Sequence, residues 1–422
     1  MNTPLLLVTS ALLFTCLINV SATLLNVKSF PTALPEELHD TYSKDAFLKS
    51  RACTRASGRL SILRNVWSTL LTLFFLLFGG FNSLDLFLRA FDLNLITTGL
   101  LYFATLALFL WLADLPFLLY NTFVIEEQFG FNRMTLSTWL LDTIKKTLLS
   151  TILGGLLLAF LLWFFNTTGS SAWFWCWIGF LLFSIVIQYL APVLIMPLFN
   201  TFVPLKESDM QRRIQDYIDK EEFPLQGIFT MDGSRRSTRL NAFFTGFGRF
   251  RKIVFFDTIL EKLNSQQIVA VLAHEMGHYK LHHIGKNFIF FAIQTGLTLY
   301  LLSLLLNSPG TGHALNMDTS SIYAGLSLFA LIYGPAGLLF GILFNAISRR
   351  HEFAADAFAA RSIGRPQDLV SSLKILSTVN LNNPAPHPLY VLLHYSHPPL
   401  LQRLQYLQSP LLNQSTDSMY YR

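Results

Sequence analysis

The chain has few charged residues for its length. Only 13% of its 422 residues are Asp, Glu, Lys or Arg, whereas 52% are hydrophobic and 14% are aromatic. Soluble domains average about 25% charged residues. This shortage of charge and the mean hydropathy of +0.45 exclude an ordinary soluble domain and indicate a protein that crosses a membrane several times.

Cysteine is also scarce, and Cys16, Cys53 and Cys176 form no Cys-x-x-Cys pair. The sequence therefore predicts neither a disulfide framework nor a cysteine-ligated metal. It contains no RNA- or DNA-binding motif, and its net charge of +6 lies mostly in a few segments between apolar runs. We expect no nucleic-acid partner, and the charge is more informative about orientation in the membrane.

Apolar runs of about 20 residues are long enough to cross a bilayer as helices. The first such run has no Lys or Arg before it, so we predict a span rather than a cleaved signal peptide. The sequence predicts seven spans, at residues 5–25, 66–86, 96–124, 148–165, 173–199, 288–306 and 323–347.

Basic residues alternate between the segments that join these spans. The first, third and fifth segments and the C-terminal tail carry several Lys or Arg residues, the second carries Arg89 alone, and the fourth and sixth carry none. The positive-inside rule then places the N-terminus outside and the odd-numbered segments and the C-terminus in the cytoplasm.

The fifth segment is long enough to fold by itself. It predicts a helix at residues 208–222 capped by Ser208, and a helix that begins at residue 265. Between them it predicts short strands at residues 228–231, 242–247 and 253–256, with a turn at 248–251.

The predicted fold is therefore mainly α, with three parts. Residues 1–199 form an N-terminal membrane domain with five transmembrane helices. Residues 200–412 form a small α+β domain that includes transmembrane helices six and seven. Residues 413–422 form a flexible tail that is rich in polar residues.

The metal-binding prediction begins with His-Glu-Met-Gly-His at residues 274–278. His274 and His278 are four residues apart, so on a helix they lie one turn apart on one face and can bind the same zinc ion. Glu275 would take the proton of an attacking water and deliver it to the leaving amine. By itself this motif leaves open that the two histidines only cover a core or a membrane interface.

A second segment, Arg-Arg-His-Glu-Phe-Ala-Ala-Asp, occupies residues 349–356. We predict Glu352 as the third zinc ligand. Asp356, one turn later, would accept a hydrogen bond from the far ring nitrogen of a ligating histidine. His351 points about 100° away from Glu352 on a helix and is not expected to be a ligand.

His282 is the alternative third ligand on the first helix. It lies eight residues after His274, about 12 Å along a continuous helix, which is too far for one ion. We expect His282 and His283 to lie at the membrane interface near the sixth span. The sequence thus predicts one zinc ion per chain, held by His274, His278 and Glu352.

Several further segments resemble one known family. They are Val-Ile-Glu-Glu-Gln-Phe-Gly-Phe-Asn-Arg at residues 124–133, Leu-Asn-Ala-Phe at 240–243, Lys-Ile-Val-Phe-Phe-Asp-Thr at 252–258 and Ser-His-Pro-Pro-Leu at 396–400. With the zinc motif, they resemble the type I CaaX prenyl endoproteases, integral-membrane zinc metalloproteases of the gluzincin type. The resemblance extends from about residue 40 to residue 406.

This resemblance implies seven transmembrane helices that form a water-filled chamber, capped by the protease domain. It implies that Asn241 lies on an edge strand that binds extended substrate, that His397 stabilises the oxyanion, and that Arg403 supports the substrate site. From the residues alone, His397 before two prolines would be an ordinary loop residue.

We therefore predict a zinc-dependent endopeptidase that cleaves peptides or membrane-associated proteins, prenylated CaaX proteins among them, on the cytoplasmic side. Alternatives are a quality-control protease for membrane proteins, a non-catalytic scaffold and a transporter. We expect a monomer in contact with membrane lipids. The C-terminal residues 419–422 contain no lysine-type retrieval signal, which favours a bacterial inner membrane over the endoplasmic reticulum.

Overall fold

The structure is a computed structural model that describes residues 3–245, 251–306, 315 and 317–409. The predicted tail at residues 413–422 lies outside the described residues. So do residues 246–247 of a predicted strand and residues 248–250 of the predicted turn.

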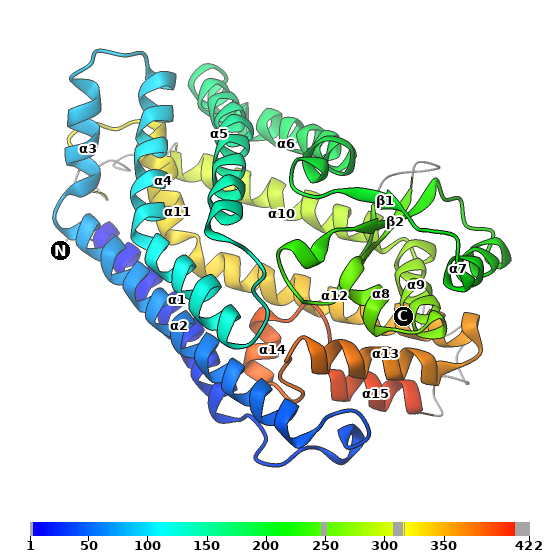
Figure 1. Cartoon of the computed structure of the whole chain (residues 1–422). Helices are drawn as coiled ribbons and strands as arrows, with labels where there is room; N and C mark the ends of the chain where they lie inside the picture. The colour runs from blue at the N-terminus through cyan, green and yellow to red at the C-terminus, as the bar shows by residue number, and fades with distance from the viewer. Residues whose placement is uncertain (1–2, 246–250, 307–314, 316, 410–422) are drawn as a thin grey trace.

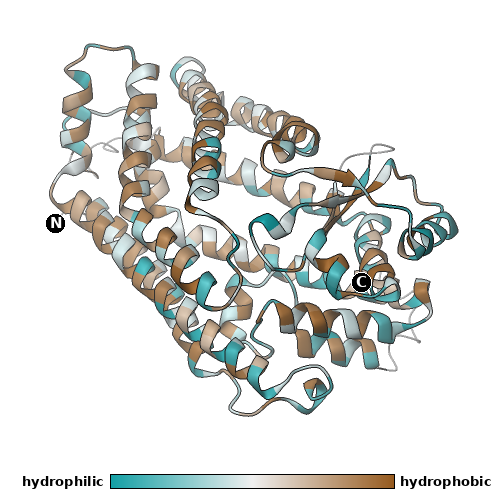
Figure 2. Cartoon of the chain, in the orientation of Figure 1, coloured by the Kyte–Doolittle hydropathy of each residue, from teal (hydrophilic) through white to brown (hydrophobic). Residues whose placement is uncertain are grey.

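Long apolar helices form the membrane part of the molecule (Figure 1). Among the described residues, six helices are long and apolar enough to cross a membrane, and a bent pair can supply a seventh span. Figure 2 shows hydrophobic residues dominating these helices. The six are α1 (Thr3–Lys28), α2 (Lys44–Leu77), α4 (Leu95–Tyr120), α5 (Leu136–Thr167), α6 (Ala172–Leu190) and α10 (His283–Leu306). The mainly α, multi-pass prediction is confirmed.

The bent pair consists of α11 (Ile322–Ile332) and α12 (Gly334–Ile363), which meet at an angle of 57°. The bend lies just before Pro335, a residue type that cannot continue the hydrogen bonds of the preceding helix. α12 then continues without interruption beyond the predicted span, which ended at residue 347, and reaches the segment that carries Glu352.

The predicted second span at residues 66–86 was wrong in its boundaries. α2 ends at Leu77, and Gly79 adopts a left-handed conformation with φ of 72° before α3 (Gly80–Arg89) begins. The Gly79-Gly80 pair allows this break because glycine tolerates positive φ. At its other end α2 begins 22 residues earlier than predicted, because its N-terminal half is polar and hydropathy does not detect it.

A four-stranded sheet forms the centre of the second part. Its strands are β1 (Phe202–Pro204), β2 (Gly227–Met231), β3 (Ala242–Thr245) and β4 (Lys252–Phe256), in the order β1-β2-β4-β3. β2 and β4 are parallel, and the other pairs are antiparallel. β3 therefore lies at an edge of the sheet. The sequence analysis missed β1, which has only three residues and ends in proline.

α8 and α9 contact the sheet, and the other helices of this part pack on further helices (Figure 1). Ser208 caps α7 as predicted, since its side chain accepts a hydrogen bond from the Gln211 amide. The helices are α7 (Asp209–Lys220), α8 (Asp257–Lys262), α9 (Ser265–Lys280), α13 (Pro366–Val379), α14 (Pro388–His394) and α15 (Leu400–Gln408). Shorter helical turns lie at Glu36–Leu38, Asn121–Glu126, Gly169–Ser171, Ala191–Ile195, Met196–Leu198 and Gly233–Arg235.

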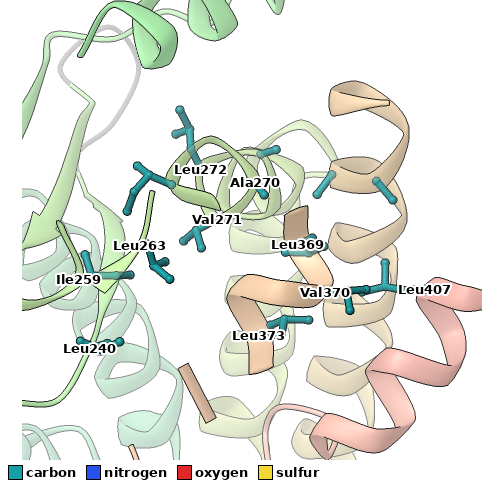
Figure 3. Packing of buried hydrophobic residues seen from close by; sticks show 14 of the residues in the cluster. Leu240, Ile259, Leu263, Ala270, Val271, Leu272, Leu369, Val370, Leu373 and Leu407 are labelled. Carbon is teal, nitrogen blue, oxygen red and sulfur yellow. The ribbon is translucent and has the colours of Figure 1, made fainter. Parts of the chain in front are cut away.

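α9 is the most deeply buried helix of the metallopeptidase part. It packs against α7, α12 and α13, and Ala270, Leu272, Ala273 and Met276 have no exposed surface. Figure 3 shows Leu272 and neighbouring α9 residues within the same apolar cluster as residues of α13 and α15. Burial of this apolar surface stabilises α9, so the histidines on it have a rigid support.

Candidate active site

The two histidines of the motif lie on the last turns of α9. The helix begins with a capping box between Asn264 and Gln267, and Gln267 also donates to the Ser371 hydroxyl on α13. These bonds fix the start of α9. One turn apart near its end, His274 and His278 bring their Nε2 atoms within 3.3 Å of each other.

Glu352 on α12 faces both histidines. Its Oε1 lies 3.2 Å from Nε2 of His278, and its Oε2 lies 3.4 Å from Nε2 of His274. The side chain is almost fully buried, and Oε2 has no hydrogen-bond donor among the described residues. Each of the three residues offers one atom that could bind a metal ion, and these atoms all lie within 4.8 Å of one another. A buried carboxylate that faces two imidazole nitrogens and has one oxygen without a hydrogen bond fits a divalent cation.

The opposite ring nitrogen of His274 contacts Asp356, also on α12. The distance from His274 Nδ1 to Asp356 Oδ1 is 2.8 Å. Burial opposes protonation of His274, but hydrogen bonds to Asp356 and Glu352 outweigh it and raise the pKa of His274 to about 9. The carboxylates that favour a proton on this ring also favour a cation beside it.

Arg403 on α15 is buried behind the predicted metal-binding residues. It donates from Nε and Nη2 to the two oxygens of Asp356, at 2.8 and 2.6 Å, and its Nη1 lies 3.8 Å from Glu352. This bidentate pair compensates the buried Asp356 carboxylate. The guanidinium also borders the cavity described next, and its contact with substrate stays a prediction.

A cavity of about 560 Å³ opens beside these groups. Six of the eight predicted site residues line it: Asn241, His274, Glu275, Glu352, His397 and Arg403. The other two, His278 and Asp356, do not line it. Burial raises the pKa of Glu275, as suits a group that exchanges a proton during a reaction.

Asn241 precedes the edge strand β3 at this cavity. The Asn241 carbonyl accepts a hydrogen bond from Phe256 of β4. Since backbone groups alternate in direction along a strand, those of the next residue, Ala242, point away from the sheet. Ala242 also lines the cavity, and its amide donates to Oδ1 of Asn241 at 2.9 Å, so the Asn241 side chain covers part of this sheet edge.

His397 lies on the other side of Glu352. Its Nε2 is 3.3 Å from Glu352 Oε1, and 65% of its side chain is exposed. Its Nδ1 is 2.9 Å from the Ser396 hydroxyl. An exposed imidazole beside the buried carboxylate can reach a molecule in the cavity.

The sequence analysis gave no role to Arg349, which fixes the segment before His397. Its Nη1 donates to the carbonyl oxygens of Val391 and Tyr395, at 3.1 and 2.7 Å. Arg349 lies one turn before Glu352 on α12. α12 thus carries Glu352, the predicted metal ligand, and also fixes the loop that carries His397, the second candidate catalytic residue after Glu275. Arg349 and Arg350 are adjacent and of the same type, so the sequence did not indicate that only Arg349 donates to backbone carbonyls.

His283 begins the span helix α10, near which the sequence predicted it, but its contact with the site was not predicted. It is only 3% exposed, and its Nδ1 lies 3.0 Å from Nδ1 of His278. α9 ends at Lys280, and His282 adopts a left-handed conformation with φ of 57° before α10 begins. His282 itself is exposed. No glycine marks this break, so the sequence did not reveal it.

Together, the fold and the site define a membrane-embedded metallopeptidase. The family model described as "CAAX prenyl protease N-terminal, five membrane helices" matches residues 23–201. The model of "Peptidase family M48" matches residues 204–411. The chain belongs to the CAAX prenyl protease 1 family of M48 metallopeptidases, and it is a metalloendopeptidase. The family prediction made from the sequence is confirmed.

Relatives from several organisms support this membership. The chain is 33% identical to CAAX prenyl protease 1 of Saccharomyces cerevisiae over 88% of each chain. It is 39% identical to the CAAX prenyl protease 1 homolog of Arabidopsis thaliana, over 70% of this chain and 69% of the relative. The crystal structure of S. mikatae Ste24p matches with a TM-score of 0.89 at 31% identity, covering 97% of this chain and 99% of that one.

These relatives are eukaryotic proteins. They confirm a multi-pass membrane protein but give no support to the predicted bacterial inner membrane.

Proposed function

We propose that this metalloendopeptidase uses one zinc ion, held by Nε2 of His274, Nε2 of His278 and the Glu352 carboxylate. The observation that carries the proposal is the convergence of these three groups beside a cavity that an edge strand also borders. Two histidines and one carboxylate, with a position left for water, form a common catalytic zinc site. Bound zinc would lower the pKa of that water and polarise the scissile carbonyl.

The residues around the cavity then act in sequence. Ala242 would bind the extended substrate through its outward-facing carbonyl, and the Asn241 side chain, whose Oδ1 accepts from the Ala242 amide, lies at the same edge. Glu275 accepts the proton of the attacking water and delivers it to the leaving amine. Asp356, held by Arg403, accepts from Nδ1 of His274 and so leaves Nε2 free as a ligand.

His397 would stabilise the negative charge that develops on the carbonyl oxygen. If the Ser396 hydroxyl donates to Nδ1, the ring proton lies on Nε2, the nitrogen that faces the site. A donor aimed at this oxygen typically contributes about 10²–10³ in rate.

The proposed substrates are proteins or peptides with prenylated CaaX C-termini, since the relatives carry the name CAAX prenyl protease. We propose that the site faces the cytoplasm of a eukaryotic cell, because the segments that carry the metal-binding residues are among the basic ones. We further propose that the spans surround a water-filled chamber and that the chain divides near residue 200. The ion pair between Arg64 and Asp114 is an argument for the chamber, because it joins two spans and stays partly exposed. Such charges are costly next to lipid.

The test uses the purified full chain in detergent. We would measure zinc content and cleavage of a farnesylated CaaX peptide and its unmodified counterpart, for wild type, Glu275→Gln and the exposed control Glu207→Gln. We expect about one zinc per chain in all three proteins, and a loss of about 10²–10⁴-fold in activity in Glu275→Gln alone. Absence of zinc from wild type, or full activity of Glu275→Gln, would contradict the proposed site. Equal cleavage of both peptides would contradict the prenylated substrate class.

A further inference from the structure

His283 lies directly against the metal-binding residue His278. Their Nδ1 atoms are 3.0 Å apart, and their rings meet at 71° with centroids 5.1 Å apart. This distance is that of a hydrogen bond between two ring nitrogens. His278 thus uses one ring nitrogen toward Glu352 and the other toward His283.

The break between α9 and α10 makes this contact possible. His283 follows His278 by five residues, and on a continuous helix such residues point about 140° apart. The chain instead leaves the helical path at His282, whose φ of 57° is uncommon for a residue other than glycine. This conformation places His283 at the start of α10 and under the ring of His278.

The hydrogen bond has only one direction compatible with metal binding. A histidine that offers the lone pair of Nε2 to a cation carries its proton on Nδ1. His278 Nδ1 therefore donates, and His283 Nδ1 accepts, which puts the proton of His283 on its own Nε2. We propose that His283 is a positioning residue that fixes the tautomer and ring orientation of His278 for metal binding. This inference rests on the proposed zinc site.

His351 holds the ring of His283 in place. The two rings stack with centroids 4.0 Å apart and planes 9° apart. His351 immediately precedes Glu352 on α12. The stack therefore connects the helix that carries the proposed ligand Glu352 to His283, which contacts the proposed ligand His278. The two histidine ligands thus have different supports: Asp356 provides a charged acceptor that Arg403 compensates, whereas His283 provides an acceptor without net charge.

Two substitutions separate the hydrogen bond from simple packing. His283→Leu replaces the imidazole with an apolar side chain of similar bulk and so removes the acceptor. His283→Asn restores an acceptor, because its Oδ1 can occupy nearly the same place as Nδ1. His282→Asn is the matched control, since His282 is exposed and asparagine tolerates its left-handed conformation. The measurements are the zinc dissociation constant of the full chain in detergent, by competition with a chromophoric chelator, and kcat and KM for a peptide.

We expect His283→Leu to bind zinc about 10–100-fold more weakly than wild type, as is usual when a group behind a metal ligand is lost. His283→Asn should recover most of the affinity, and His282→Asn should match wild type. Unchanged zinc affinity in His283→Leu would overturn the inference while leaving the zinc site intact, and so would equal losses in the Leu and Asn variants. A wild-type chain that binds no zinc would overturn the proposed function and this inference together.

Discussion

Gly277 on α9 lies against the backbone of Ala355 on α12. A Cβ atom on Gly277 would come within 3.0 Å of the Ala355 Cα and 3.1 Å of its carbonyl oxygen. His278 follows Gly277 directly, and Glu352 lies nearly one turn before Ala355. The absence of a side chain at Gly277 therefore sets how closely the metal-binding residues of the two helices approach.

Gly277→Ala should consequently reduce both metal affinity and activity. The obstacle is backbone, which cannot rotate away as a side chain can, so the two helices must separate. We expect activity to fall by about 10–100-fold, as displacements of catalytic groups by fractions of an ångström commonly do. Gly285→Ala on α10 is the control, because its Cβ would meet nothing within 4 Å. Wild-type zinc affinity and activity in Gly277→Ala would show that the helices tolerate a methyl group here.

Loss of Arg349 should affect catalysis without affecting the metal. Arg349→Met removes the donors that hold the carbonyls of Val391 and Tyr395, so the segment that carries His397 should loosen. We expect kcat to fall by about 10-fold, less than the ~10²–10³-fold expected for His397→Ala, with zinc content unchanged. Arg350→Met is the matched control, since Arg350 is exposed. A parallel loss of zinc would show that Arg349 supports Glu352 instead.

The ion pair between Asp40 and Lys374 should make stability depend on pH. Lys374 Nζ donates to both Asp40 oxygens at 2.7 and 2.8 Å, and the Lys374 side chain is 8% exposed. The hydrogen bond from Lys374 lowers the pKa of Asp40 below its usual 3.8. A carboxylate with a lowered pKa stabilises the fold above its unfolded-state pKa, and this contribution is lost as the pH falls through the lowered value.

We therefore expect Asp40→Asn to have a lower Tm than wild type at pH 7, with the difference closing as the pH falls below about 4. Thermal unfolding of both proteins in detergent between pH 7 and 3 measures this. Glu37→Gln, an exposed neighbouring acid, should match wild type throughout. A difference that stays constant down to pH 3 would mean that the Asp40 charge does not cause it.

Substitution of Asp85, at the far end of the membrane part, should lower the stability of the fold more than substitution of any other acid there. Asp85 is fully buried and accepts hydrogen bonds from the Tyr323 hydroxyl, from Nε of Arg89 and from the Thr319 hydroxyl. Asp85→Asn leaves the arginine without its charge partner. We expect destabilisation on the order of 3 kcal/mol, seen as a lower Tm. Asp92→Asn on the exposed turn after α3 is the control. An unchanged Tm for Asp85→Asn would exclude this contribution.

The main features that the sequence predicted depend on local spacing. His274 and His278 were paired by helical periodicity, and Glu352 and Asp356 by the same one-turn separation on a second helix. The structure brings these four residues together. Apolar runs likewise revealed the membrane helices, because hydropathy depends on each segment by itself.

The features that the sequence missed depend on contacts between distant segments or on single backbone conformations. His283 joins the site only because His282 adopts positive φ, and Arg349 acts only because α14 packs beside α12. The polar half of α2 was missed because its helical structure lies outside the apolar window. None of these leaves a pattern in a short stretch of sequence.

α12 is a single uninterrupted helix from Gly334 to Ile363. Gly334 lies against Thr15 of the first span, and Glu352 lies roughly 27 Å further along the same axis. One continuous helix therefore links the contact with the first span to the position of Glu352, and α9 packs against the same helix. The α9 histidines and the α12 carboxylate thus share one support that begins inside the membrane part.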